Sequence, residues 1–144
     1  MTLLGSTVDD CGVLVETEAT RQDSTPSRMV RVRSALGTVV VPWRGDPAGV
    51  GREHHVEWTV DEDMTWAGNT MPAAIASSAV GEEGDWIVLR GRLSLTADKA
   101  AFLEVGGSQI LFDLADPLPP DGADGTWVEV RVRRDSIGLW PYQL

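Results

Sequence analysis

Apolar and polar residues alternate along most of the chain, and the ten residues 86–95 carry the longest such pattern. A period of two over this length predicts a β-strand, because successive side chains of a strand point to opposite faces. The apolar face of the stretch holds Ile87, Leu89, Leu93 and Leu95. Gly91 lies in the middle of that face, where a glycine is typical of a bulge or a bend. We therefore predict the long, bent strand of a small closed or half-closed β-barrel.

Shorter alternating stretches lie on both sides of this strand. They predict further strands at 12–19, 29–33, 38–43, 55–61, 100–105, 108–113, 127–133 and 137–142. Only residues 69–80 read as a helix. Asn69 or Thr70 could cap that helix, and Pro72 suits its first turn.

The two halves of the chain present their elements in the same order, at a spacing of about 70 residues. Repeated order at a fixed spacing is typical of an internal duplication, and five short strands led by a long, bent one resemble the OB-fold barrel. We predict an all-β protein of two tandem OB-like small barrels, residues 1–68 and 86–144, joined by a short helix and linker at 69–85. A single large β-sandwich or barrel is the alternative.

Composition narrows the class of protein. The chain has 144 residues and a net charge of −10, which disfavours binding through nucleic-acid phosphates and suits a basic partner. Cys11 is the only cysteine, so an internal disulfide and a Cys-rich zinc site are excluded. His54 and His55 are adjacent, and on a strand they would point to opposite faces, so they cannot share one metal ion. We expect no metal and no cofactor.

No catalytic signature stands out in the sequence. The Gly-x-Ser-x-Gly motif, a glycine-rich phosphate loop ending in Lys-Ser/Thr and the dinucleotide-binding fingerprint are all absent. We therefore predict a protein without enzymatic activity.

The start of the chain gives an expectation about location. The first ten residues lack the basic start and apolar run of a secretion signal. No window is long and apolar enough for a membrane span, so we expect a cytoplasmic protein with no membrane partner. Eleven arginines against a single lysine fit a high-GC bacterial genome.

The densest cluster of carboxylates lies at the end of the predicted strand 55–61. It comprises Glu57, Asp61, Glu62 and Asp63, with Trp66 close behind. Acidic side chains speed the encounter with a basic protein, and a tryptophan supplies buried area at an interface. We predict that these five residues bind a protein partner. In size and charge the chain is similar in general character to immunity and inhibitor-type proteins that neutralise a basic enzyme. A solvated turn is the plainer interpretation of the cluster.

Arginines and aromatic residues share the outward faces of the strands predicted in the second half. They are Trp86, Arg90, Arg92, Phe102, Trp127, Arg131 and Arg133. Single-stranded nucleic-acid binders use such a mixture for stacking and phosphate contacts, which makes oligonucleotide binding the second hypothesis. Glu104 and Glu129 fall on the same faces, so cross-strand charge pairs are the favoured interpretation of the arginines. A structural subunit of a larger assembly is the third hypothesis.

Overall fold

In the computed structural model, the described part of the chain comprises residues 13–19, 29–46, 51 and 53–141. Within it the protein is built from β-strands, with two short 3₁₀ turns, Asp121–Ala123 (η2) and Arg134–Ser136 (η3), and no α-helix. The predicted all-β class is confirmed. No helix in this part of the chain is both long and apolar enough to cross a membrane.

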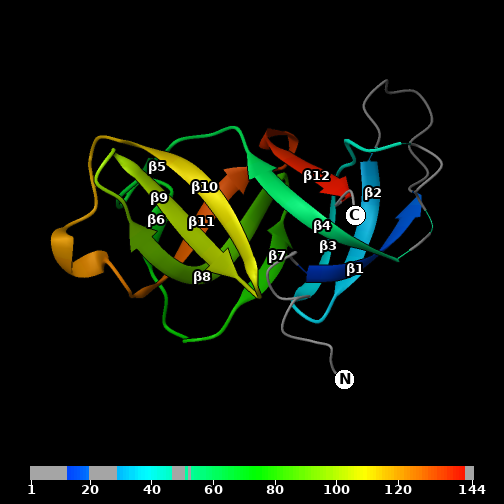
Figure 1. Cartoon of the computed structure of the whole chain (residues 1–144), viewed down its shortest axis with the longest axis horizontal. Helices are drawn as coiled ribbons and strands as arrows, with labels where there is room; N and C mark the ends of the chain where they lie inside the picture. The colour runs from blue at the N-terminus through cyan, green and yellow to red at the C-terminus, as the bar shows by residue number, and fades with distance from the viewer. Residues whose placement is uncertain (1–12, 20–28, 47–50, 52, 142–144) are drawn as a thin grey trace.

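Five strands form the first sheet, in the order β12-β4-β1-β2-β3 (Figure 1). Their bounds are β1 (Val13–Ala19), β2 (Met29–Ser34), β3 (Gly37–Pro42), β4 (Glu53–Val60) and β12 (Ile137–Pro141). Directly after β3, Trp43 forms a parallel bridge to Leu139 of β12, and the Arg44 N–H donates to the Leu139 carbonyl at 2.9 Å. The two edges of the sheet therefore meet, and the sheet is nearly closed into a barrel.

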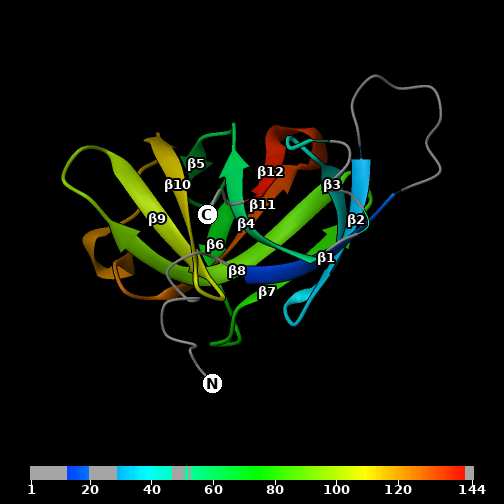
Figure 2. The same ribbon diagram turned by 45° about the vertical axis from the view of Figure 1, so that its right-hand side comes forward.

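The second sheet has the order β5-β10-β9-β8-β11-β6, and β7 pairs with β8 beside it. Its bounds are β5 (Met64–Thr65), β6 (Thr70–Pro72), β7 (Ala79–Glu83), β8 (Trp86–Leu95), β9 (Ala100–Val105), β10 (Ser108–Ala115) and β11 (Trp127–Arg133). Figures 1 and 2 both place β2 and β3 at one end of the molecule and β9 at the other. Buried side chains from both sheets form one continuous hydrophobic cluster.

The strand predicted at 86–95 is confirmed as β8, and Gly91 is the point at which β8 changes neighbours. One edge of β8 pairs with β7 up to Arg90 and with β9 from Arg92 onward. A Cβ at Gly91 would lie 2.3 Å from the backbone oxygen of Glu104, far inside van der Waals contact. Glycine is therefore required here by the close approach of β9.

The helix predicted at 69–80 is wrong. Thr70–Pro72 is instead the strand β6, which pairs with β11, and Thr70 is fully buried. Asn69 stabilises the turn before β6, because its side-chain oxygen accepts hydrogen bonds from the Thr65 N–H at 2.9 Å and the Thr70 hydroxyl at 2.9 Å. A helix this short depends on tertiary packing, and here the pairing with β11 outweighs the local capping signals.

Most strands of the first sheet come from residues 13–60, and most strands of the second come from residues 79–133. Each sheet also contains a strand from elsewhere in the chain. The C-terminal strand β12 pairs with β4 over five residue positions. In the other direction, β5 follows β4 in the chain but runs parallel to β10, and β6 pairs with β11. β12 therefore joins a sheet built mainly from β1 to β4, and β5 and β6 join a sheet built mainly from β7 to β11.

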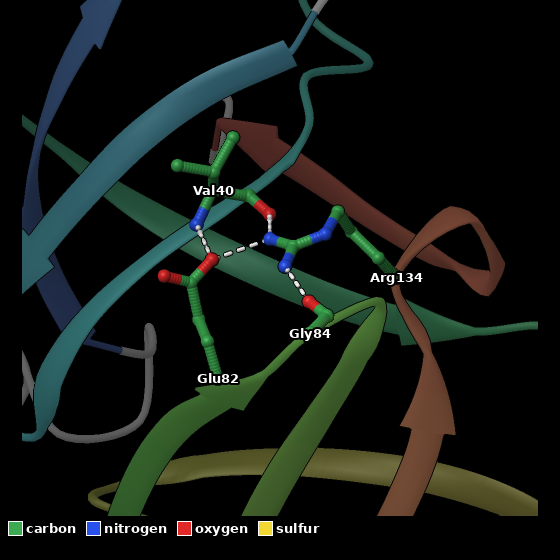
Figure 3. Close-up of polar contacts among 4 residues, drawn as sticks. All are labelled: Val40, Glu82, Gly84 and Arg134. Atoms are coloured by element: carbon green, nitrogen blue, oxygen red, sulfur yellow. Dashed lines mark hydrogen bonds and ion pairs between the residues drawn. The ribbon is translucent and has the colours of Figure 1, made fainter.

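Arg134 and Glu82 join the two sheets where β3 approaches β7 (Figure 3). A Glu82 carboxylate oxygen accepts the Val40 N–H at 2.9 Å, and the Arg134 guanidinium donates to Glu82, to the Val40 carbonyl and to the Gly84 carbonyl. These two side chains thus satisfy backbone groups of β3 that a neighbouring strand would otherwise bind.

The same contacts affect the ionisation of Glu82. Partial burial acts to raise its pKa, but hydrogen bonds from Arg134 and the Val40 N–H and the charges of Arg134 and Arg31 outweigh it. The pKa of Glu82 is therefore lowered from its ordinary value of 4.5. Neither Glu82 nor Arg134 stands out in the sequence pattern, because Glu82 comes shortly before the strand predicted at 86–95 and Arg134 directly follows the strand predicted at 127–133.

Candidate binding surface

A groove of about 470 Å³ lies between β4 and β10, and we call it the β4/β10 groove. After β4 the chain continues through residues 61–63 into β5, which pairs with the end of β10. β4 and the end of β10 are therefore connected through residues 61–63 and β5. Among the described residues β4 and β10 are not paired in either sheet, and the groove occupies the space between them.

Carboxylates line both walls of this groove. They are Glu57, Asp61, Glu62, Asp63 and, from β10, Asp113. All of them except Glu62 are exposed. No lysine or arginine is among the described residues that line it. The structure thus brings four of the five residues of the predicted protein-binding surface to one place.

Glu62 differs from its neighbours because it is already bonded within the protein. One of its carboxylate oxygens accepts the Arg133 N–H at 3.0 Å, and the other lies 3.5 Å from the Asn69 side-chain nitrogen. That nitrogen also donates to the Asp63 carbonyl at 2.8 Å. Glu62 therefore holds the turn after β4 against the end of β11, and the remaining acidic residues present their charges to solvent.

Apolar side chains complete the groove. Phe102 and Leu111 face each other across β9 and β10, and they are 36% and 53% exposed. Trp58 and Val60, from the inward face of β4, form the floor. Leu111 was missed at the level of sequence, although strict alternation along residues 108–113 places it on the polar face with Gln109. An apolar residue at a polar position was the available signal.

Trp66 is not among the residues that line the groove. Its side chain is half-buried and packs against the hydrophobic core, and its backbone N–H donates to the Pro117 carbonyl at 2.8 Å. The apolar surface expected from Trp66 is supplied by Phe102 and Leu111.

The arginines of the second predicted surface lie on the outer face of β8 and β11, which we call the β8/β11 face. Arg90 lies opposite Glu129, with 3.6 Å between guanidinium and carboxylate, and donates to the Ser77 carbonyl at 2.7 Å. Arg131 pairs with Glu83 at 2.9 Å. The contact between Arg90 and Glu129 matches the cross-strand charge pairs favoured at the level of sequence, whereas Glu83 on β7 reaches Arg131 across β8.

The other members of that surface are spread along β8. Arg92 lies opposite Trp127 and donates to the Gly125 carbonyl at 3.1 Å. The guanidinium carbons of Arg131 and Arg133 each lie 5.5 Å from the centre of the Trp86 ring.

Phe102 lies far from Trp86 on the same sheet. It pairs with Ser94, at the opposite end of β8 from Trp86. At about 3.3 Å per residue that separation is roughly 26 Å, so the aromatic residues do not form one stacking platform.

The described residues contain no group of three or more His, Cys, Asp or Glu placed to hold a metal ion. His55 is half-buried on β4, and its Nε2 atom has no hydrogen-bond partner. Cys11 and the side chain of His54 lie outside the described residues.

Comparison of the chain with models of protein families, with curated proteins and with solved structures gives no match. The groove, its charge and its exposed apolar pair are therefore the basis on which a function is assigned.

Proposed function

We propose that this protein is a non-enzymatic, acidic binding module that holds a basic protein partner in the β4/β10 groove. The observation that carries the proposal is the combination of exposed carboxylates on both walls with the exposed pair Phe102 and Leu111. The net charge of −10 steers a basic partner toward the protein over distances comparable to the Debye length. The outcome of binding is stoichiometric masking of the partner, as in immunity and inhibitor-type proteins.

Charge and apolar area have separate roles in this proposal. Glu57, Asp61 and Asp113 accelerate the encounter and select a basic partner, because exposed charges mainly affect association rates. Phe102 and Leu111 supply affinity, since each buried side chain of this size contributes about 1–2 kcal/mol. A surface with both is better suited to binding a protein than an acidic turn alone.

The finer description of the fold also belongs to this proposal: two OB-like barrels, related by duplication, that have exchanged their last strands. In one sheet β1, β2 and β3 are consecutive neighbours, β4 lies beside β1, and β12 runs parallel to the end of β3. In the other, β8, β9 and β10 are consecutive neighbours, β11 lies beside β8, and β5 runs parallel to the end of β10. These pairings are similar in the two sheets, and the second sheet has β6 and β7 in addition.

The test compares two variants of equal charge. Glu57→Lys/Asp61→Lys reverses two carboxylates of the groove, and Asp98→Lys/Asp121→Lys reverses two exposed carboxylates outside it. Each exchange adds two charges per residue, so both variants change from −10 to −6. Wild type and the two variants are used to capture proteins from a lysate of the organism that encodes the chain.

We expect one basic protein to be retained by wild type and by Asp98→Lys/Asp121→Lys, with binding to Glu57→Lys/Asp61→Lys weakened about tenfold or more. Raising the salt concentration should reduce the difference, because exposed charges are screened. Equal retention of every captured protein by both variants would remove the groove from the proposal.

A further inference from the structure

The edge of β10 that faces the groove can be identified from its pairing with β9. The Leu114 N–H donates to the Lys99 carbonyl at 3.0 Å, and the register continues through Phe112 opposite Ala101. Backbone groups of a strand point alternately to its two sides, so the even-numbered residues of β10 bond to β9. The N–H and C=O groups of the odd-numbered residues therefore point toward the groove.

This edge is open along its middle. β5 pairs with β10 only at Leu114 and Ala115. Within the described residues, no strand pairs with this edge of β10 at Gln109 or Leu111. An open strand edge beside a groove is a template for pairing with another extended segment.

The walls of the groove indicate which segment would fit. A strand added beside β10 would point alternate side chains down onto Trp58 and Val60, which form the apolar floor. The intervening side chains would point up between Glu57 and Asp61 on β4 and Asp113 on β10. The complementary sequence alternates small apolar and basic residues.

We propose that the basic partner enters the β4/β10 groove as an extended segment that adds a strand to the edge of β10 at Gln109 and Leu111. This inference rests on the proposed function and specifies its mode of recognition. It assigns affinity to main-chain hydrogen bonds, and it assigns selectivity to an alternation of basic and apolar side chains.

The probe is an eight-residue peptide of alternating lysine and valine with blocked ends. Two matched peptides carry N-methyl groups, one on every lysine and the other on every valine. N-methylation removes the backbone donor at alternate positions while the side chains and the charge stay the same. Affinity for the full chain is measured by calorimetry, and hydrogen exchange of the Gln109 and Leu111 amides is followed by NMR.

We expect the unmodified peptide to slow exchange at Gln109 and Leu111, and one of the two methylated peptides to bind at least about tenfold more weakly. Equal affinities of all three peptides, with both amides unprotected, would overturn strand addition. If Glu57→Lys/Asp61→Lys still weakened all three peptides in that case, the acidic groove would remain the binding site. If the unmodified peptide bound wild type no better than this variant, the proposed function would fall as well.

Discussion

Two outer surfaces of this protein combine charged and aromatic side chains, and they differ in how their charges are partnered. On the β8/β11 face, Arg90 lies opposite Glu129 and Arg131 pairs with Glu83. In the β4/β10 groove, Glu57 and Asp61 are exposed, and no cation is among the described residues lining the groove. Strand register therefore decides which charges are neutralised within the protein and which stay exposed to solvent.

A strand rich in charged and aromatic side chains is therefore not enough to indicate a binding site. Trp86 has two arginines beside its ring, yet these contacts stabilise the sheet surface itself. Leu111 has no charged neighbour across the sheet, since it faces Phe102, and both are exposed. Within the described part of the chain, the groove is distinguished by exposed carboxylates, a lining without lysine or arginine, and adjacent exposed apolar area.

The largest expected effect comes from Gly91, where β9 closely approaches β8. Gly91→Val would place its Cβ against the Glu104 carbonyl, so β9 would have to move. We expect the free energy of unfolding to fall by roughly 3 kcal/mol or more, as measured by urea denaturation. Gly81→Val on the neighbouring strand is the control, because nothing lies within 4 Å of a Cβ there. Equal losses in both variants would contradict a requirement for glycine imposed by the close approach of β9.

Replacing Arg134 would disturb the contact that joins the two sheets. Arg134→Met keeps much of the side-chain length but leaves the Val40 carbonyl and the Glu82 carboxylate without the guanidinium. We expect a loss of roughly 2 kcal/mol in unfolding free energy, the magnitude of hydrogen bonds to a charged group. A variant as stable as wild type would show that the contact between the two sheets does not depend on this side chain.

The hydrogen bonds of Glu82 at this contact make the stability of the protein depend on pH. Because the pKa of Glu82 is lowered in the folded protein, its contribution is present above the ordinary value of 4.5 and is lost as pH falls through the folded pKa. Stability measured between pH 6 and pH 3 should therefore fall less steeply in Glu82→Gln than in wild type. Parallel curves for the two proteins would contradict the assigned hydrogen bonds.

Single neutralisations should separate the two surfaces directly. Glu129→Gln removes the carboxylate opposite Arg90 and should lower the unfolding free energy by about 0.5–1 kcal/mol. Asp61→Asn removes one of several neighbouring carboxylates, so stability should be unchanged or rise by a few tenths of a kcal/mol. If Asp61→Asn lost as much stability as Glu129→Gln, the groove carboxylates would be structural.

Trp86 is expected to give the smallest effect. Trp86→Leu keeps an apolar side chain and removes the contacts with Arg131 and Arg133, each worth about 0.5 kcal/mol at an exposed site. The variant should unfold at a slightly lower urea concentration and bind the lysine–valine peptide as wild type does. Weaker peptide binding would place part of the binding site on the β8/β11 face.

Much of this arrangement follows from the sequence, because alternation is a local property. Strand β8, with Gly91 on its buried face, and the exposed positions of Glu57 and Asp61 all follow from a period of two. The pairing of β12 with β4 and the pairing of β5 with β10 do not follow from it. Both halves end in short strands after similar elements, so alternation does not indicate which sheet either strand completes.

Two further features required knowledge of tertiary pairing. Asn69 and Pro72 have the chemistry of a helix start, and only the partner β11 turns this segment into a strand. Asp113 and Leu111 are ordinary positions of a hairpin until β4 lies beside them. Long-range contacts of this kind have no signature in a window of neighbouring residues.

The most direct test of the account is the affinity of the alternating lysine–valine peptide for three proteins, measured by calorimetry at low salt. Wild type and Asp98→Lys/Asp121→Lys should bind with similar affinity, and Glu57→Lys/Asp61→Lys should bind about tenfold more weakly or not at all. Equal weakening in both variants would show that only net charge matters, and it would contradict a binding site in the β4/β10 groove.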